Sequence, residues 1–158
     1  MPVADLNALY QRPAGTSKRP PLLPKGSAYL ATVTAFDGGT NTRTGNSYVR
    51  WFFRFRDWDP SIPADMREGI NLDSYIGMYC DMYTTDKALF MLDDFIRQVG
   101  VDLPTDGSRK YEEVLPEVIG SNVLVEVDSY IPTGRTAEEA VNNVRRMIAD
   151  PAAWTSRA

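Results

Sequence analysis

The 158-residue sequence contains no histidine, and its only cysteine is Cys80. Without histidine the chain lacks the commonest general base, the Ser/His and Cys/His nucleophile pairs and every histidine-containing metal site. A lone cysteine cannot form an internal disulfide, which suits a reducing compartment. We therefore expect neither an enzyme nor a cofactor, and we interpret Cys80 as a small buried hydrophobic residue.

Long apolar runs are absent as well. No stretch approaches the roughly 18 apolar residues that a membrane span needs, and residues 1–13 contain no hydrophobic signal-peptide segment. Phosphate-binding motifs are missing, because Gly38-Gly39 matches neither a P-loop nor a GxGxxG pattern. These absences predict a soluble, intracellular protein with no membrane partner.

Carboxylates are present, but not in a metal-binding pattern. Asp57-Trp58-Asp59 and Asp93-Asp94 could each offer two oxygen ligands to Mg²⁺. Neither pair has a third ligand at a recognisable spacing, so we interpret these acids as solvated or capping groups. We predict no metal site, and a metal-dependent nuclease is the least favoured function.

The length fits one domain with a substantial core. Residues 1–25 contain five prolines, so we expect a flexible Pro-rich N-terminal arm with at most one helical turn at residues 5–10. We predict that the domain spans residues 26–149 and that residues 150–158 form a short C-terminal tail.

Period-two alternation predicts strands at residues 27–36, 48–57, 72–83 and 122–131. Apolar residues at three- and four-residue steps predict a helix over residues 88–100, and a short amphipathic helix follows at 111–119. Residues 137–149 are ambiguous. A capping box at Thr136 and Glu139 favours a helix there, and strand pairing of residues 143–148 is the alternative.

This order of elements predicts an α+β, mainly β fold. It has too few strands for a two-sheet sandwich and no βαβ alternation. A small OB-like barrel of about five strands would leave few unprotected edges. We therefore expect such a barrel, with one packed helix between strands and short accessory helices.

The formal net charge of −4 conceals an uneven distribution. Residues 1–56 carry eight Lys or Arg and two Asp or Glu, whereas the other residues carry nine and 19. A polyanion responds to the local field within about 8 to 10 Å rather than to the total charge. The basic part of the chain is therefore where we expect an anionic ligand.

The strand at residues 48–57 has two faces of different chemistry. Val49, Trp51, Phe53 and Phe55 share one side, which predicts a core face. The other side carries Tyr48, Arg50, Phe52, Arg54 and Arg56. Arginine pairs with phosphates and aromatic rings stack on unpaired bases, so this face favours single-stranded nucleic acid. The alternative is an ordinary solvated face in which arginine stems cover the rings.

Flanking segments add further candidates. The polar loop at residues 37–47 is expected to be flexible and to close over a bound strand, and tyrosines of the strand at 72–83 either extend the stacking surface or simply cover the sheet. The predicted nucleic-acid-binding residues are Asn41, Arg43, Asn46, Tyr48, Arg50, Phe52, Arg54, Arg56, Tyr75 and Tyr79.

Several segments form a recognisable layout over residues 22–149. They are Leu23-Pro24-Lys25-Gly26, Thr42-Arg43-Thr44-Gly45 before the aromatic strand, the FIRQVGV ending of the first helix, Val118-Ile119-Gly120, and Asn142-Asn143-Val144-Arg145-Arg146. This layout resembles a family of phage-encoded single-stranded-DNA-binding proteins with an OB-like fold. In that family the last segment resembles a closing strand. The ending at residues 154–158 departs from the acidic tail by which many such proteins recruit partners.

The resemblance implies that the protein binds single-stranded DNA without sequence specificity during phage DNA replication or recombination. It implies the cytoplasm of the infected host cell as the location. Replication or recombination proteins and a second copy of the chain are further candidate partners. The alternative function is a protein-interaction or virion structural component that uses the same aromatic face.

Overall fold

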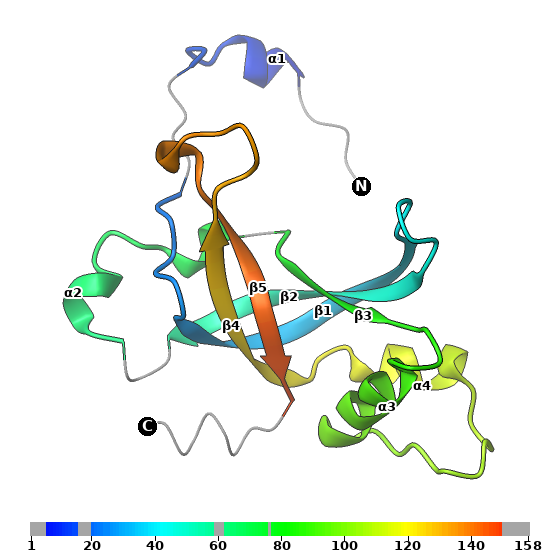
Figure 1. Ribbon diagram of the computed structural model, residues 1–158. Coiled ribbons are helices and arrows are strands. Elements are labelled where there is room, and N and C mark those ends of the chain that lie inside the picture. The colour runs from blue at the N-terminus through cyan, green and yellow to red at the C-terminus, as the bar shows by residue number, and fades with distance from the viewer. Residues whose placement is uncertain (1–5, 16–19, 59–61, 76, 150–158) are drawn as a thin grey trace.

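A computed structural model of the chain describes residues 6–15, 20–58, 62–75 and 77–149. These residues form one antiparallel sheet of five strands with short helices around it, so the α+β, mainly β class is confirmed (Figure 1). The strands are β1 (Ala28–Thr40), β2 (Ser47–Trp58), β3 (Tyr79–Tyr83), β4 (Asn122–Tyr130) and β5 (Val141–Ile148). The helices are α1 (Leu6–Tyr10), α2 (Ala64–Arg67), α3 (Leu89–Gln98) and α4 (Tyr111–Val118), with 3₁₀ turns η1 (Leu72–Ser74) and η2 (Ala137–Glu139).

The strand order in the sheet is β3-β2-β1-β4-β5. The long strand β1 pairs with β2 along most of its length and with β4 over residues 28–32, so the β4–β5 hairpin crosses the β1–β2 hairpin at a steep angle (Figure 1). This curvature brings the edge strands β3 and β5 into contact, but they do not pair. The expected barrel is therefore not closed, and an open seam remains between β3 and β5.

Two β-bulges decide which side chains of β1 and β2 face inward. The register between these strands skips Thr34 in β1 and Arg56 in β2. A bulge inserts one residue and reverses the alternation beyond it. Phe55 and Trp58 are consequently both buried, and Phe36 packs beside Trp51. The alternation of β2 itself is intact from residue 49 to 55.

The predicted core face of β2 is confirmed. Val49, Trp51, Phe53 and Phe55 are at most 7% exposed, and Trp51 contacts the Phe95 ring of α3 at 5.5 Å between centroids. The predicted helix at residues 88–100 is α3, whose buried residues are Leu92, Phe95 and Ile96. The predicted helix at 111–119 is α4, which buries Val114 and Val118.

The lone cysteine lies on the inner face of β3, opposite Trp51. Burial is the main reason why the pKa of the Cys80 thiol is raised to about 11, and the nearby Asp81 carboxylate adds to the effect. Cys80 therefore stays a neutral thiol near pH 7.

The third strand is shorter than predicted. We expected residues 72–83 to be extended, but residues 72–74 form η1, whose first turn is capped by Asn71 accepting a hydrogen bond from the Asp73 backbone. Gly77 then adopts a φ of +79°, which a regular strand does not contain. Local turn chemistry thus restricts β3 to residues 79–83.

The helix favoured for residues 137–149 was wrong. The capping box of Thr136 and Glu139 does form, but it starts only the single 3₁₀ turn η2. The chain then becomes β5, because Val144 and Met147 lie opposite Val127 and Val125 of β4 and extend its apolar face. Pairing with β4 overrides the local helical preference.

The N-terminal arm ends earlier than residue 25. Leu23 is fully buried, and its backbone N–H donates to Asn142 Oδ1 at 2.8 Å while Asn142 Nδ2 donates to its carbonyl at 3.1 Å. The Gly26 N–H donates to the Val127 carbonyl at 2.9 Å. The segment from residue 20 to 26 is therefore part of the domain, and Leu23 anchors it.

Adjacent leucines test this anchor. Leu23→Ala is expected to lower the free energy of unfolding by about 2 to 5 kcal/mol because it leaves a cavity in the core. Leu22, which is 46% exposed, is the matched control, and Leu22→Ala should change stability by less than about 0.5 kcal/mol. Urea unfolding of both variants measures the two losses, and equal losses would contradict the burial of Leu23 in the core.

Candidate nucleic-acid interface

The outer faces of β2 and β3 form an ordered ladder of side chains. Cross-strand register places Tyr48 opposite Tyr83, Arg50 opposite Asp81 and Phe52 opposite Tyr79, and we call these six residues the β2–β3 ladder. The rings of each aromatic pair meet edge to face, with centroids 5.8 Å apart for the first pair and 6.4 Å for the second. Tyr79 and Tyr83 are 43% and 37% exposed, so ring surface is available to a ligand.

Arg50 occupies the centre of the ladder. Its Nε and Nη2 donate to the two carboxylate oxygens of Asp81 at 2.8 and 2.9 Å, in a bidentate pair. Its guanidinium carbon lies 3.7 Å from the Tyr79 ring centroid and 5.1 Å from that of Tyr48. The hydrogen bonds to Asp81 raise the pKa of Arg50 above its already high usual value. Arg50 is thus held in place and neutralised by Asp81, and its guanidinium packs against the rings of Tyr48 and Tyr79.

The other two arginines of this face are more accessible. Arg54 pairs with Asp73 of η1 at 3.1 Å, but both side chains are more than half exposed, so a phosphate can compete for the guanidinium. Arg56 Nε donates to Thr32 Oγ1 at 3.1 Å. Within the described residues Arg56 has no carboxylate partner.

Folding brings acidic side chains beside some of the cations that the sequence concentrates in residues 1–56. Asp37 of β1 lies opposite Arg50 on the outer face, and Asp73 and Asp81 come from the acidic part of the chain. Arg50 and Arg54 therefore each have an aspartate partner, whereas Arg56 has none among the described residues. The positive charge of this face is therefore smaller than the count of arginines in the sequence indicates, because Asp73 and Asp81 are distant in the chain but adjacent in the fold.

The loop between β1 and β2 is held by its own hydrogen bonds. Asn41 Oδ1 accepts from the backbone N–H groups of Arg43 and Thr44 at 2.9 and 3.2 Å, and Asn41 Nδ2 donates to the Tyr83 hydroxyl at 3.3 Å. The Asn46 carbonyl accepts from Asn41 N–H at 2.8 Å. The side chains of Arg43 and Asn46 are exposed. Asn41 thus shapes the loop and ties it to the ladder.

Tyr75 lies apart from the other candidates. It precedes β3, its ring centroid is 6.5 Å from that of the core residue Phe55, and its hydroxyl donates to the Pro21 carbonyl. Burial raises its pKa. The structure brings Tyr48, Phe52 and Tyr79 together in the ladder, but it places Tyr75 against the core and the N-terminal segment.

The sequence pointed to Tyr83 as one of the tyrosines that could extend the stacking surface, but it did not point to Asp81 or Gly39. Alternation along the sequence places Asp81 and Tyr83 on the same face as Tyr79. The sequence does not give the register that pairs these residues with β2. Gly39 matters because a β-carbon there would lie 2.5 to 2.6 Å from the hydroxyl oxygen and two ring carbons of Tyr48. Only glycine lets the Tyr48 ring lie down across β1.

The carboxylates of the described residues show no metal centre. No group of three or more Cys, Asp or Glu side chains in that part of the chain is placed to hold a metal ion. Asp93 accepts from the Tyr111 hydroxyl at 2.6 Å, and Asp94 pairs with Arg97 at 3.7 Å. Asp59 lies outside the described residues. None of the described helices is long and apolar enough to cross a membrane.

Comparisons with protein-family models and with functionally characterised proteins gave no match to this chain.

Two neighbouring glycines test the support of Tyr48. In Gly39→Ala the new methyl group should displace the Tyr48 ring from β1 and from Arg50, whereas Gly38 has no atom within 4 Å of its β-position. We expect the Tyr48 ring resonances in NMR spectra to shift in Gly39→Ala and to stay in place in Gly38→Ala. Unchanged resonances in both variants would show that the ring does not rest on Gly39.

Proposed function

We propose that the protein binds single-stranded DNA without sequence specificity through the β2–β3 ladder. The observation that carries the proposal is the ordered set of exposed rings beside accessible arginines. Stacking of one base on an aromatic side chain is worth about 1 to 3 kcal/mol and tolerates any base. The edge-to-face pairs and Arg50 hold the rings in place, which lowers the entropy lost when bases stack.

The strand order supports an OB-like architecture for this function. In that fold a five-stranded, partly open barrel binds oligonucleotides on the face of its second and third strands and on the loop between its first and second strands. Here β1 pairs with both β2 and β4, and α3 and α4 lie between β3 and β4. The ladder and the loop at residues 41–46 occupy the corresponding positions. We propose a role in phage DNA replication or recombination on the strength of the resemblance.

The contacts to phosphate are assigned to fewer arginines than the sequence suggested. Arg50 is neutralised by Asp81 and is unsuited to a phosphate. Arg43 at the loop and Arg56 at the far end of β2 are exposed, and Arg54 can exchange Asp73 for a phosphate. These positions lie on either side of the rings, so a strand could contact a phosphate before and after its stacked bases.

Salt dependence tests this arrangement. With two or three phosphates neutralised, the logarithm of the association constant for oligo-dT should fall by about 1.4 to 2 per tenfold rise in salt. Fluorescence anisotropy titrations at two or more salt concentrations measure this slope. Arg56→Ala should reduce the slope by about 0.7, and Arg97→Ala on α3 is the control that should leave it unchanged. Absence of binding at low salt would refute the proposal.

Neutralising the acid at the centre of the ladder gives an independent test. Asp81→Asn removes the carboxylate that balances Arg50, so we expect tighter binding of oligo-dT and a salt slope that is steeper by about 0.7. The comparison is Asp73→Asn, which removes the acid paired with Arg54. Asp73 is more exposed than Asp81, so this variant should change the affinity for oligo-dT and the salt slope less. If Asp81→Asn weakens binding, the ion pair contributes mainly by positioning Tyr79.

One observation favours a second candidate function. A face on which arginines and aspartates balance, with exposed rings between them, also suits docking of another protein chain. Such a complex would survive high salt, and the protein would fail to bind oligo-dT at low salt. Light scattering after size-exclusion chromatography, repeated at high salt, would detect a stable oligomer of this kind.

A further inference from the structure

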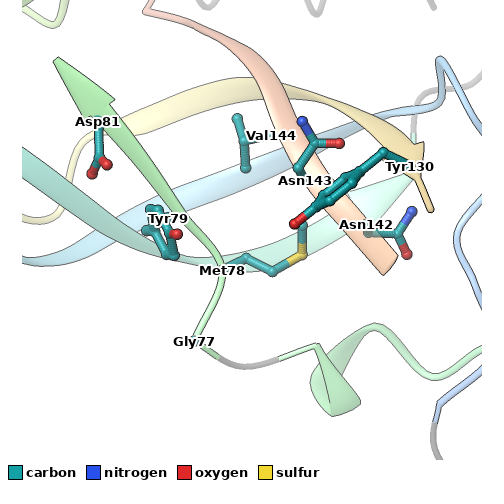
Figure 2. Close-up of a pocket in the computed structure, with 8 residues that line it drawn as sticks. All are labelled: Gly77, Met78, Tyr79, Asp81, Tyr130, Asn142, Asn143 and Val144. Atoms are coloured by element: carbon teal, nitrogen blue, oxygen red, sulfur yellow. The ribbon is translucent and has the colours of Figure 1, made fainter. Parts of the chain in front are cut away.

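A cavity of about 380 Å³ lies in the open seam between β3 and β5. Figure 2 shows Met78 and Tyr79 on one side of it and Tyr130, Asn142 and Asn143 on the other. The full lining consists of Gly77, Met78, Tyr79, Asp81, Tyr130, Asn142, Asn143 and Val144. The cavity is within the size range of small-molecule sites and combines aromatic rings with amide groups.

Two neighbouring asparagines in this lining have different roles. The Asn142 side chain is fully engaged inside the protein, with Oδ1 accepting from Leu23 N–H and Nδ2 donating to the carbonyls of Leu23 and Asp128. Asn143 is exposed, and its amide makes no hydrogen bond to any of the described residues. Asn143 therefore offers one acceptor and two donors to whatever enters the cavity.

The charge of the lining selects against a phosphate. Asp81 is the charged residue that borders the cavity. Its carboxylate is paired with Arg50, which lies on the ladder side. The residues that line the cavity include no Lys or Arg, so a phosphate in the seam would lie near the Asp81 carboxylate with no cation of the lining to bind it. A neutral planar group with hydrogen-bonding edges is a better match, because it can contact the tyrosines and the Asn143 amide together.

The cavity continues directly from the ladder. Tyr79 and Asp81 belong to both, since they form cross-strand pairs with Phe52 and Arg50 and also line the seam. The Arg50 guanidinium covers one part of the Tyr79 ring at 3.7 Å, so the exposed 43% of this residue lies away from Arg50. A strand that crosses the ladder from β2 to β3 arrives at the seam.

We propose that the seam cavity receives one unpaired base of a single strand lying on the ladder. Tyr130, which is 53% exposed, supplies a ring surface for this base, and the Asn143 amide hydrogen-bonds its edge. Every base carries donors or acceptors on its edge, so the contact adds affinity without demanding a sequence. This inference rests on the proposed single-stranded DNA binding. It adds a base-binding site that lies beyond the β2–β3 ladder, between β3 and β5.

Strands with and without bases test the proposal. The two probes are oligo-dT of about 16 nucleotides and an abasic strand of the same length, both titrated at low salt by fluorescence anisotropy. Tyr130→Ala should weaken oligo-dT binding by about 5- to 100-fold, and Asn143→Ala by about 2- to 10-fold. Neither variant should alter the affinity for the abasic strand or the salt slope, because neither residue contacts phosphate.

The control is Ile131→Ala, because Ile131 is 50% exposed, follows Tyr130 in the chain and is not part of the lining. It should bind both strands as the unaltered protein does. If the protein binds oligo-dT but Tyr130→Ala and Asn143→Ala bind it equally well, the cavity is not a base site and the proposed function stands. Equal weakening on both probes also overturns the base site. No binding of either probe by the unaltered protein overturns both proposals.

Discussion

Burial of Trp51 is the interaction on which the rest of the structure depends. Its ring contacts Phe36 of β1 and Phe95 of α3, and it lies opposite Cys80 of β3, so one side chain joins three strands and a helix. Within the described residues its indole N–H has no hydrogen-bond partner, which costs about 1 to 3 kcal/mol. The packing of so large a ring offsets that loss. With Trp51 fixed inward, Arg50 and Phe52 are fixed outward.

The buried inner face of β2 decides which of its side chains point outward. The chemistry of that outer face also depends on β3, the strand that pairs with it. β2 alone presents an alternation of rings and arginines, as expected of a cationic surface. β3 adds Asp81 to the middle of that alternation and tyrosines at both sides of it. The result is a rigid aromatic surface with little net charge, in which affinity for a strand would come more from stacking than from ion pairing. Accessible cations lie at its margins.

Local patterns predicted β1, β2, β4, α3 and the two faces of β2, because periodicity alone decides which side chains of a strand share a side. They failed where a distant segment decided the outcome. Residues 141–148 form a strand because they pair with β4 and extend its apolar face. Leu23 lies in the core, where the Asn142 side chain hydrogen-bonds its backbone N–H and carbonyl. In the candidate site, Tyr48, Phe52 and Tyr79 lie together because each is on the outer face that alternation predicted for its strand. The neutralisation of Arg50 depended on register, which no single strand encodes.

The hydrogen bonds between Leu23 and Asn142 join residues 119 positions apart. Contacts of such separation form late in folding, since the loop that they close carries a large entropy loss. The β1–β2 hairpin is local and can form while the chain is still being synthesised. β5 and the segment before β1 can meet only after residue 142 has left the ribosome. The aromatic face can therefore form before the protein has completed its domain, and the seam is the last part to take shape.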